Sequence, residues 1–255
     1  MTRSVLLFAA ALVWTSGAAH AERLTIAVSS PEVRITSNFA GSPVTVFGVI
    51  DDVASTAARP GGYEMAVMIL GPNERVVARR KDRVLAIWAN RDARAIGGAP
   101  SFYGLSTSAP LDTVASPNAM QRLQIGFQNI RFVIDGRSSG LDEGAIEFRD
   151  AFIRLRQQER LYTEATSVEF IGDRIFRSTV FLPANIRVGR YTVVAYLFSE
   201  GELLAHAQER FDVSKAGIDG SIAAFARNQS LLYGILCAGL ALFVGWAGGV
   251  VFRRD

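Results

Sequence analysis

Hydrophobic and polar residues alternate along two stretches of the chain, residues 24–111 and 166–213, and this alternation predicts β-strands. Successive side chains of a strand point to opposite faces, so a period of two is expected where one face is buried. Turns rich in Gly, Pro and Asn separate the apolar runs about every 8 to 12 residues, a spacing typical of an antiparallel sandwich. The strands predicted in this way span residues 24–28, 33–35, 44–48, 63–70, 84–88, 168–171, 175–182, 191–198 and 203–213, with a further strand starting at Val76.

The stretch between these two regions has a helical pattern instead. Ser116 is a capping residue and Pro117 suits the first helical position, which predicts a helix over residues 119–130 whose one breaker is Gly126. A second helix is predicted over residues 142–162. We expect its buried side to hold Ile146, Ala151, Phe152 and Leu155, and its solvated side Arg149, Arg154, Arg156, Glu159 and Arg160.

A faint internal repeat links the two β regions. Residues 62–70 resemble residues 190–198, and in each case a Tyr (Tyr63, Tyr191) opens a strand. A Tyr in this position is typical of the tyrosine corner of immunoglobulin-type sandwiches. We therefore predict a mainly β fold with a helical middle segment, in which two Ig-like β-sandwich modules flank the helices. One composite sandwich that carries the helices as an insertion is the competing arrangement.

Apolar segments at the two ends of the chain predict where the protein works. Arg3, the apolar run 5–13 and the small residues around His20 form the three-part pattern of a cleaved signal peptide. Residues 231–252 contain no charge and are followed by two Arg, and about 22 helical residues at 1.5 Å each cross a hydrocarbon core of about 30 Å. Because basic flanks stay inside, we expect a single-pass protein of the inner (cytoplasmic) membrane with a periplasmic bulk and a cytoplasmic C-terminus.

The segment before this transmembrane helix is also expected to be helical, because Ile218, Ile222 and Phe225 fall on one stripe that suits a membrane surface. The complete organisation follows from these boundaries. It comprises a signal peptide (1–21), an N-terminal Ig-like β module (22–111), a helical segment (112–165), a second β module (166–214), a juxtamembrane amphipathic helix (215–230), the transmembrane helix (231–252) and a cytoplasmic tail (253–255).

Composition excludes several classes of function. The single Cys, Cys237, lies in the predicted transmembrane helix, so the exported part can form no internal disulfide. His206 is the one His left after signal removal, and a zinc, copper or haem site built from the usual ligands is therefore not expected, nor is any cofactor. Without the charged residues of the two ends, 24 basic and 23 acidic residues remain. Such a near-neutral exported domain argues against nucleic-acid binding.

Several short motifs together resemble a known family. They are Phe39-x-Gly41-x-x-Val44-x-Val46-x-Gly48, Ile175-Phe176-Arg177 leading to Leu182-Pro183-Ala184, Gly189-x-Tyr191, and the tail from Tyr233-Gly234 to Gly245-Trp246. With the signal peptide, they are similar to an alphaproteobacterial family of transmembrane proteins, and the similarity extends over the whole chain. The motifs are structural, so the resemblance implies no activity. It does imply an association with membrane permeases of the sulfite-exporter type.

Candidate catalytic residues are few and poorly supported. Ser138 lies in a G-x-S-x-G pattern, and Asp173 and His206 follow it in the chain order of a hydrolase triad. A real nucleophile elbow enters its helix directly, which this segment does not, so we expect a loop. Asp51 and Asp52 are adjacent and would point to opposite faces of a strand, which favours a turn over an acid/base or calcium pair. The protein is not expected to be an enzyme.

Two surfaces are candidates for binding a partner. Arg75, Arg79, Arg80 and Arg83 could form a docking patch for anionic head groups or an acidic partner, or they could simply protect an edge strand from aggregation. A stripe of small residues would let a second helix approach the transmembrane helix closely; it comprises Gly234, Ala238, Ala241, Gly245 and Gly249. We therefore predict a non-enzymatic accessory or scaffold protein whose partner is a membrane protein or a second copy. A hydrolase using Ser138 and a small-ligand sensor are the alternatives.

Overall fold

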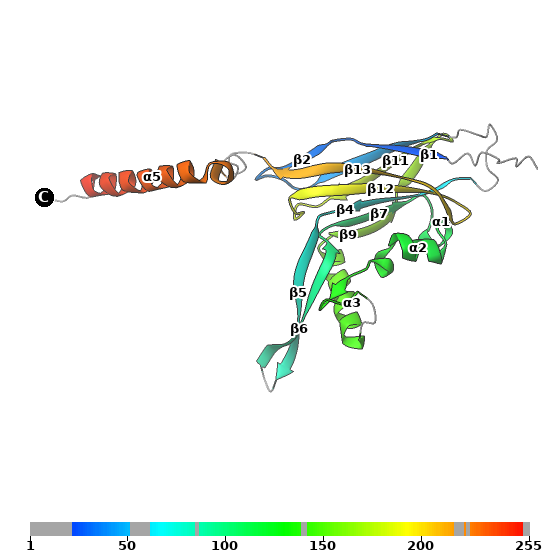
Figure 1. Cartoon of the computed structure of the whole chain (residues 1–255), viewed down its shortest axis with the longest axis horizontal. Coiled ribbons are helices and arrows are strands. Elements are labelled where there is room, and N and C mark those ends of the chain that lie inside the picture. Colours follow the sequence, from blue (N-terminus) through cyan, green and yellow to red (C-terminus); the bar gives the residue numbers. More distant parts are fainter. Residues whose placement is uncertain are drawn as a thin grey trace, which may run out of the picture.

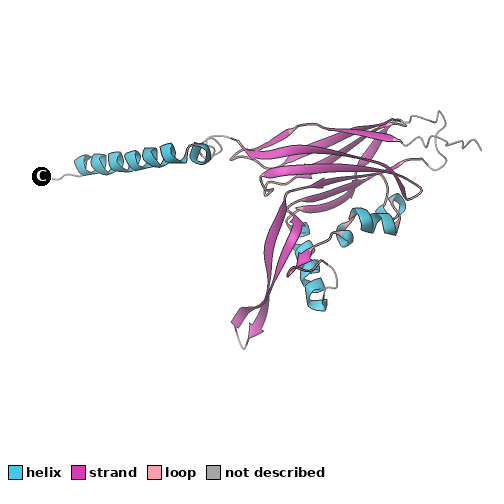
Figure 2. Cartoon of the chain, viewed as in Figure 1, coloured by secondary structure: helices cyan, strands magenta, loops and turns pink. Residues whose placement is uncertain are grey.

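Two β-sheets form the centre of the computed structural model, and a long hairpin, a group of helices and an extended C-terminal helix project from them (Figure 1). The structure describes residues 22–51, 62–84, 87–138, 142–216, 222 and 225–251. The predicted signal peptide, residues 1–21, and the predicted tail, residues 253–255, lie outside these ranges. The mainly β fold with a helical middle is confirmed (Figure 2).

The first sheet is antiparallel throughout and has a regular buried face. In order across the sheet, its strands are β1 (Arg23–Val28), β3 (Ser42–Asp51), β11 (Ile175–Leu182) and β10 (Val168–Ile171). Buried and exposed residues alternate strictly along β11, as the period of two predicts. Gly48 of β3 lies opposite Phe176, and a Cβ at that position would collide with the Phe176 ring. The core therefore needs Gly there.

The second sheet is mixed and is buried more deeply. Its order is β2 (Glu32–Ile35), β13 (Glu202–Lys215), β12 (Gly189–Ser199), β4 (Glu64–Leu70), β7 (Tyr103–Thr107) and β9 (Tyr162–Thr166). The outer pairs β2–β13 and β7–β9 are parallel, and the others are antiparallel. Residues 65–69 of β4 are buried on both faces, because other elements cover this sheet on either side.

Strands from the two predicted β modules pair with each other. In the first sheet β3 pairs with β11, and in the second β4 pairs with β12. These last two strands carry the internal repeat, which therefore relates direct neighbours in one sheet. The pairings join residues 23–107 and 162–215 into one sandwich, with the segment between them inserted. This is the composite arrangement: each of the two sandwich sheets contains strands from both predicted modules.

A third, smaller sheet leaves the sandwich as a hairpin. It consists of β5 (Asn73–Val84), β6 (Ile87–Pro100) and the short β8 (Val133–Ile134). The separate strand predicted over residues 84–88 is wrong, since Val84 ends β5 and Ile87 begins β6, and the two are paired at the tip. The charged residues between Val77 and Val84 continue the ladder with β6.

The helical segment begins as predicted but ends earlier. After α1 (Leu111–Val114), α2 (Pro117–Leu123) starts with Pro at its first position, and the Ser116 hydroxyl accepts the Ala119 N–H at 3.4 Å. The predicted extension to residue 130 is wrong, because Gln124 adopts a left-handed conformation (φ 56°) and Gly126 follows at φ 91°. A single 3₁₀ turn, η1 (Phe127–Asn129), completes the segment.

Helix α3 (Glu143–Gln158) is capped by Asp142, which accepts the Ala145 N–H at 2.8 Å. Its predicted buried side is mostly wrong. Phe152 is buried, but Ile146 and Leu155 are 41% and 50% exposed. The face that packs inward consists of Ala145, Phe148, Phe152 and Ile153. The helix also stops before the predicted residue 162, because Tyr162 opens β9.

The C-terminal helix α5 (Ser230–Val251) confirms the predicted helix in position, and by its length and composition it is a candidate membrane span. None of its apolar window is buried against the rest of the chain. Before it, β13 runs to Lys215, and residues 217–221, 223 and 224 of the predicted juxtamembrane helix lie outside the described residues. Residues 225–228 are helical, and the Phe225 ring meets the Tyr233 ring edge-on at 6.1 Å.

Candidate functional site

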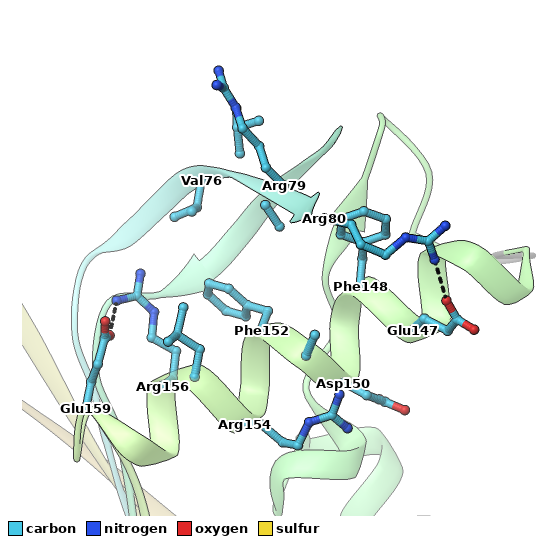
Figure 3. A pocket seen from close by; sticks show the side chains of 14 residues that line it. Val76, Arg79, Arg80, Glu147, Phe148, Asp150, Phe152, Arg154, Arg156 and Glu159 are labelled. Atoms are coloured by element: carbon cyan, nitrogen blue, oxygen red, sulfur yellow. Dashed lines mark hydrogen bonds and ion pairs between the residues drawn. The ribbon is translucent and has the colours of Figure 1, made fainter. Parts of the chain in front are cut away.

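A groove of about 840 Å³ separates β5 from α3 (Figure 3). Five consecutive residues of β5, Val76 to Arg80, line one side of it, and one side of α3 lines the other. Helix α3 packs against β6 and β9, and it meets β5 through two ion pairs, Glu74–Arg156 and Arg80–Glu147. The α3 residues that line it are Glu147, Phe148, Asp150, Ala151, Phe152, Arg154, Leu155 and Arg156, with Glu159 just beyond.

The base of the groove is apolar. Phe148 and Phe152 are buried there, and Phe152 packs against the Phe132 ring behind it with ring centres 5.7 Å apart. Leu155 and Val77 are half exposed, at 50% and 55%. A segment bound in the groove would bury both side chains beside the aromatic base.

One end of the groove is closed by a buried ionic cluster. Glu74, whose side chain is 6% exposed, forms ion pairs with Arg156 and, at 2.8 Å, with Arg187. Arg156 also pairs with Glu159 at 3.0 Å, and its guanidinium lies 5.0 Å from the centre of the Phe152 ring. Sequence reasoning placed Arg156 on a solvated face, which is wrong, because only 11% of its side chain is exposed.

A tyrosine hydroxyl holds the third member of this cluster in place. The Tyr191 O–H donates to the main-chain carbonyl of Arg187 at 2.8 Å, four residues upstream. This is the hydrogen bond that the tyrosine-corner prediction required. Burial raises the pKa of Tyr191 to about 12, so the hydroxyl keeps its proton, and this donated hydrogen bond, even in strongly alkaline solution. The corner thus ties the start of β12 to the position from which Arg187 reaches Glu74.

The charges along the groove leave a positive excess. Arg80 pairs with Glu147 at 3.0 Å, and Asp150 pairs with Arg149 at 2.9 Å, so both carboxylates on the α3 side are neutralised. Within the described part of the chain, Arg79 and Arg154 form no ion pair. The free charges at the groove are therefore basic.

The structure divides the predicted docking patch. Arg79 and Arg80 line the groove, whereas Arg75 is exposed on β5 outside its lining. Arg83 lies near the hairpin tip, opposite Trp88. The hydrophobic pattern gave no signal for the other half of the site, because the α3 face toward the groove depends on how the hairpin packs.

The small-residue stripe lies along α5, where every member is exposed. A Cβ added to Gly234, Gly245 or Gly249 would meet no atom within 4 Å. Nothing in the described chain covers this side of the helix.

The candidate catalytic residues lie on different sheets. Ser138 is exposed after β8, Asp173 is in the turn between β10 and β11, and His206 is on β13 beside Tyr196, with ring centres 6.3 Å apart. Asp51 ends β3 and is exposed, and Asp52 lies outside the described residues. The structure thus does not assemble the hydrolase triad. Among the residues it describes, no three His, Cys, Asp or Glu side chains are grouped to hold a metal ion.

A family model described as "Putative transmembrane protein (Alph_Pro_TM)" matches residues 23–254. The chain belongs to this family. The match covers the sandwich, the inserted hairpin and helices, and α5 together, which confirms the resemblance seen in the structural motifs. It also supports membrane localisation with one candidate spanning helix. No curated protein and no solved structure matches the chain.

Proposed function

We propose that this protein is a non-enzymatic, single-pass membrane scaffold that uses α5 to bind a membrane partner and presents its sandwich outside the cytoplasm. The observation that carries the proposal is the exposed stripe on α5. A simple anchor needs only bulky apolar side chains, whereas small residues on one side allow a second helix to approach within van der Waals contact.

Charge distribution supports the orientation. The N-terminal segment has the pattern of a signal peptide, and Arg253 and Arg254 directly follow the apolar run at the other end. Together they favour a periplasmic sandwich and a cytoplasmic C-terminus.

The sandwich itself fits a binding role. We infer that it is Ig-like, because β1-β3-β11-β10 and β13-β12-β4 follow the strand orders A-B-E-D and G-F-C of immunoglobulin domains, and Tyr191 forms the corner near the start of the F strand. Such sandwiches host binding sites on many unrelated proteins. A permease of the sulfite-exporter type is the partner that the family resemblance favours, and a second copy of the chain is the other candidate.

Two substitutions of equal size test the role of α5. Gly245→Leu fills the stripe, while Gly239→Leu adds the same side chain on another side of the helix. We expect a native membrane complex, isolated in mild detergent and sized by native electrophoresis, to be lost with Gly245→Leu and kept with Gly239→Leu. If both variants retain the complex, or neither forms it, the stripe does not mediate binding.

Topology is tested separately with a cysteine label. A Cys237→Ser chain carrying Ser138→Cys has one thiol, at an exposed position of the segment inserted in the sandwich. A membrane-impermeant maleimide should label it in intact spheroplasts. If the thiol is labelled only after lysis, the sandwich lies on the cytoplasmic side and the proposed orientation is wrong.

A further inference from the structure

We propose that the groove beside β5 binds an extended acidic peptide segment of a partner protein, which adds to the free edge of β5 as a new strand. This proposal goes beyond the role of α5, because it concerns a second interaction surface on the sandwich side of the chain. Peptide binding by strand addition uses main-chain hydrogen bonds for affinity and side-chain pockets for selectivity.

The edge of β5 is open. In the three-stranded sheet β5 pairs with β6 alone, and no other described main-chain group hydrogen-bonds to its second edge. Consecutive residues of β5 line the groove, although neighbouring side chains of a strand point to opposite faces. It follows that the strand presents its edge, and not one face, to the groove.

The hydrogen bonds of β6 show which groups point outward. Ala95 donates its N–H to the Asp135 carboxylate and accepts the Asp135 N–H, both at 2.9 Å, so its main chain faces β8. Val77 lies opposite Ala95 in the β5–β6 ladder. Pairs alternate between bonded and non-bonded along an antiparallel ladder, so Val77 and, two residues on, Arg79 direct their N–H and C=O groups toward the groove.

The basic side chains of β5 and of the groove favour an acidic strand at this edge. β5 carries five basic residues against two acidic ones, and Arg79 and Arg154 have no ion-pair partner in the described chain. Pairing two copies of β5 would bring like charges together across the new ladder, which is destabilising. An acidic strand would instead meet opposite charges, while its apolar side chains would contact Leu155 and Phe152 at the base.

The test uses the full chain in non-ionic detergent micelles and a fluorescein-labelled, acetylated octapeptide that alternates Asp and Val. Binding is measured by fluorescence anisotropy at low salt. Three further peptides, one with reversed charge and two N-methylated, separate the contributions of charge and of main-chain hydrogen bonds. One replaces Asp with Lys, and the other two are N-methylated at every second residue, one in each frame, which removes main-chain donors without changing charge. We expect the Lys peptide not to bind, and at least one N-methylated frame to bind about tenfold more weakly, as the loss of one or two hydrogen bonds predicts.

Matched variants of the protein test the same edge. Val77→Pro removes an outward N–H that β6 does not use, and Pro is tolerated on edge strands, whereas Val77→Ala keeps that donor. We expect about fivefold weaker binding for Val77→Pro relative to Val77→Ala, from the loss of about one hydrogen bond. Arg154→Glu should weaken binding by more than Arg122→Glu, which reverses an exposed charge on α2.

Three results would overturn the proposal. The first is equal affinity for both N-methylated frames and the unmodified peptide, which would mean that charge alone binds the peptide. This comparison uses the unchanged chain, so it remains valid if Val77→Pro fails to fold. The second is equal affinity of the two Val77 variants when circular dichroism shows both folded. The third is concentration-dependent dimerisation that Val77→Pro abolishes without any peptide binding, because the occupant of the edge would then be a second copy. None of these measurements depends on the partner of α5.

Discussion

Breaking the buried cluster at Glu74 should destabilise the sandwich more than any exposed ion pair can. Arg156→Met removes the guanidinium that pairs with Glu74 and keeps much of the side-chain volume. The Glu74 carboxylate, whose side chain is 6% exposed, would then be left with Arg187 alone. Removing one partner of a buried pair typically costs about 3–5 kcal/mol, because the remaining charge stays buried.

The expected loss is at the lower end of that range, about 3 kcal/mol, because Arg187 still contacts Glu74 at 2.8 Å. For a domain of this size, 1 kcal/mol changes Tm by about 2–4 °C, so Arg156→Met should lower Tm by about 6–12 °C. Arg187→Ala is the matched control. Its side chain is 64% exposed, and solvent screening limits an exposed pair to about 0–1 kcal/mol.

The assay is urea and thermal unfolding of the full chain in non-ionic detergent, followed by circular dichroism of the β signal. A double variant, Glu74→Leu with Arg156→Met, removes both charges and should recover much of the loss, since an apolar pair of similar volume can replace a buried ion pair. The reasoning would be refuted if Arg156→Met cost no more than Arg187→Ala, or if the double variant were less stable than Arg156→Met.

Three further substitutions test other parts of the fold. Tyr191→Phe removes the corner hydrogen bond and should cost about 1 kcal/mol in urea unfolding; an unchanged midpoint would contradict a stabilising corner. Gly48→Ala should cost about 1–3 kcal/mol, because its Cβ would overlap the Phe176 ring, and a fully native Tm would show that the core can relax. The Ala95 N–H and a neighbouring guanidinium hold the pKa of Asp135 below its usual range, so its contribution is present above about pH 4 and is lost as pH falls through the lowered pKa. The stability difference between wild type and Asp135→Asn should therefore shrink as pH falls from 6 to 3, and a constant difference would rule out this linkage.

The sequence predicted most strands of the sandwich because their signal is local, but it missed β7 and β9. Alternation along residues 175–182 reports one buried and one exposed face, and the strand β11 has that burial pattern. The prediction failed where a strand was polar or buried on both sides. Residues 84–88 looked like a separate strand because the hairpin continues through charged residues, whose pairing with β6 is not visible in hydrophobicity.

The helix α3 also shows that a local pattern does not predict which side chains are buried. Its start was predicted to within one residue, and in the structure Asp142 caps the first turn by a local contact three residues long. Its buried side was placed mostly wrongly, since Ile146 and Leu155 are as apolar as the residues that pack inward. The hairpin and β9 decide which face is covered, and both are distant in sequence.

Half of the candidate groove could be anticipated. The basic run in β5 was recognised as a possible docking surface, because charge clusters are visible in sequence. The buried Glu74 and its partner Arg156 were not, because an ion pair between residues 82 positions apart leaves no local pattern. A charged residue in an amphipathic helix is assigned to solvent by default, and only packing can bury it.

The sequence by itself determined the β-rich composition, the transmembrane helix and the absence of an internal disulfide outside it. These properties depend on residue type and on short periods, such as the uncharged run that becomes α5. Tertiary structure alone decided that the two β regions share their sheets, that Glu74 is buried between arginines, and that the edge of β5 is left open beside α3. The physical reason is that strand pairing and burial join residues far apart in the chain, and the free energy of those contacts depends on partners that a local pattern does not contain.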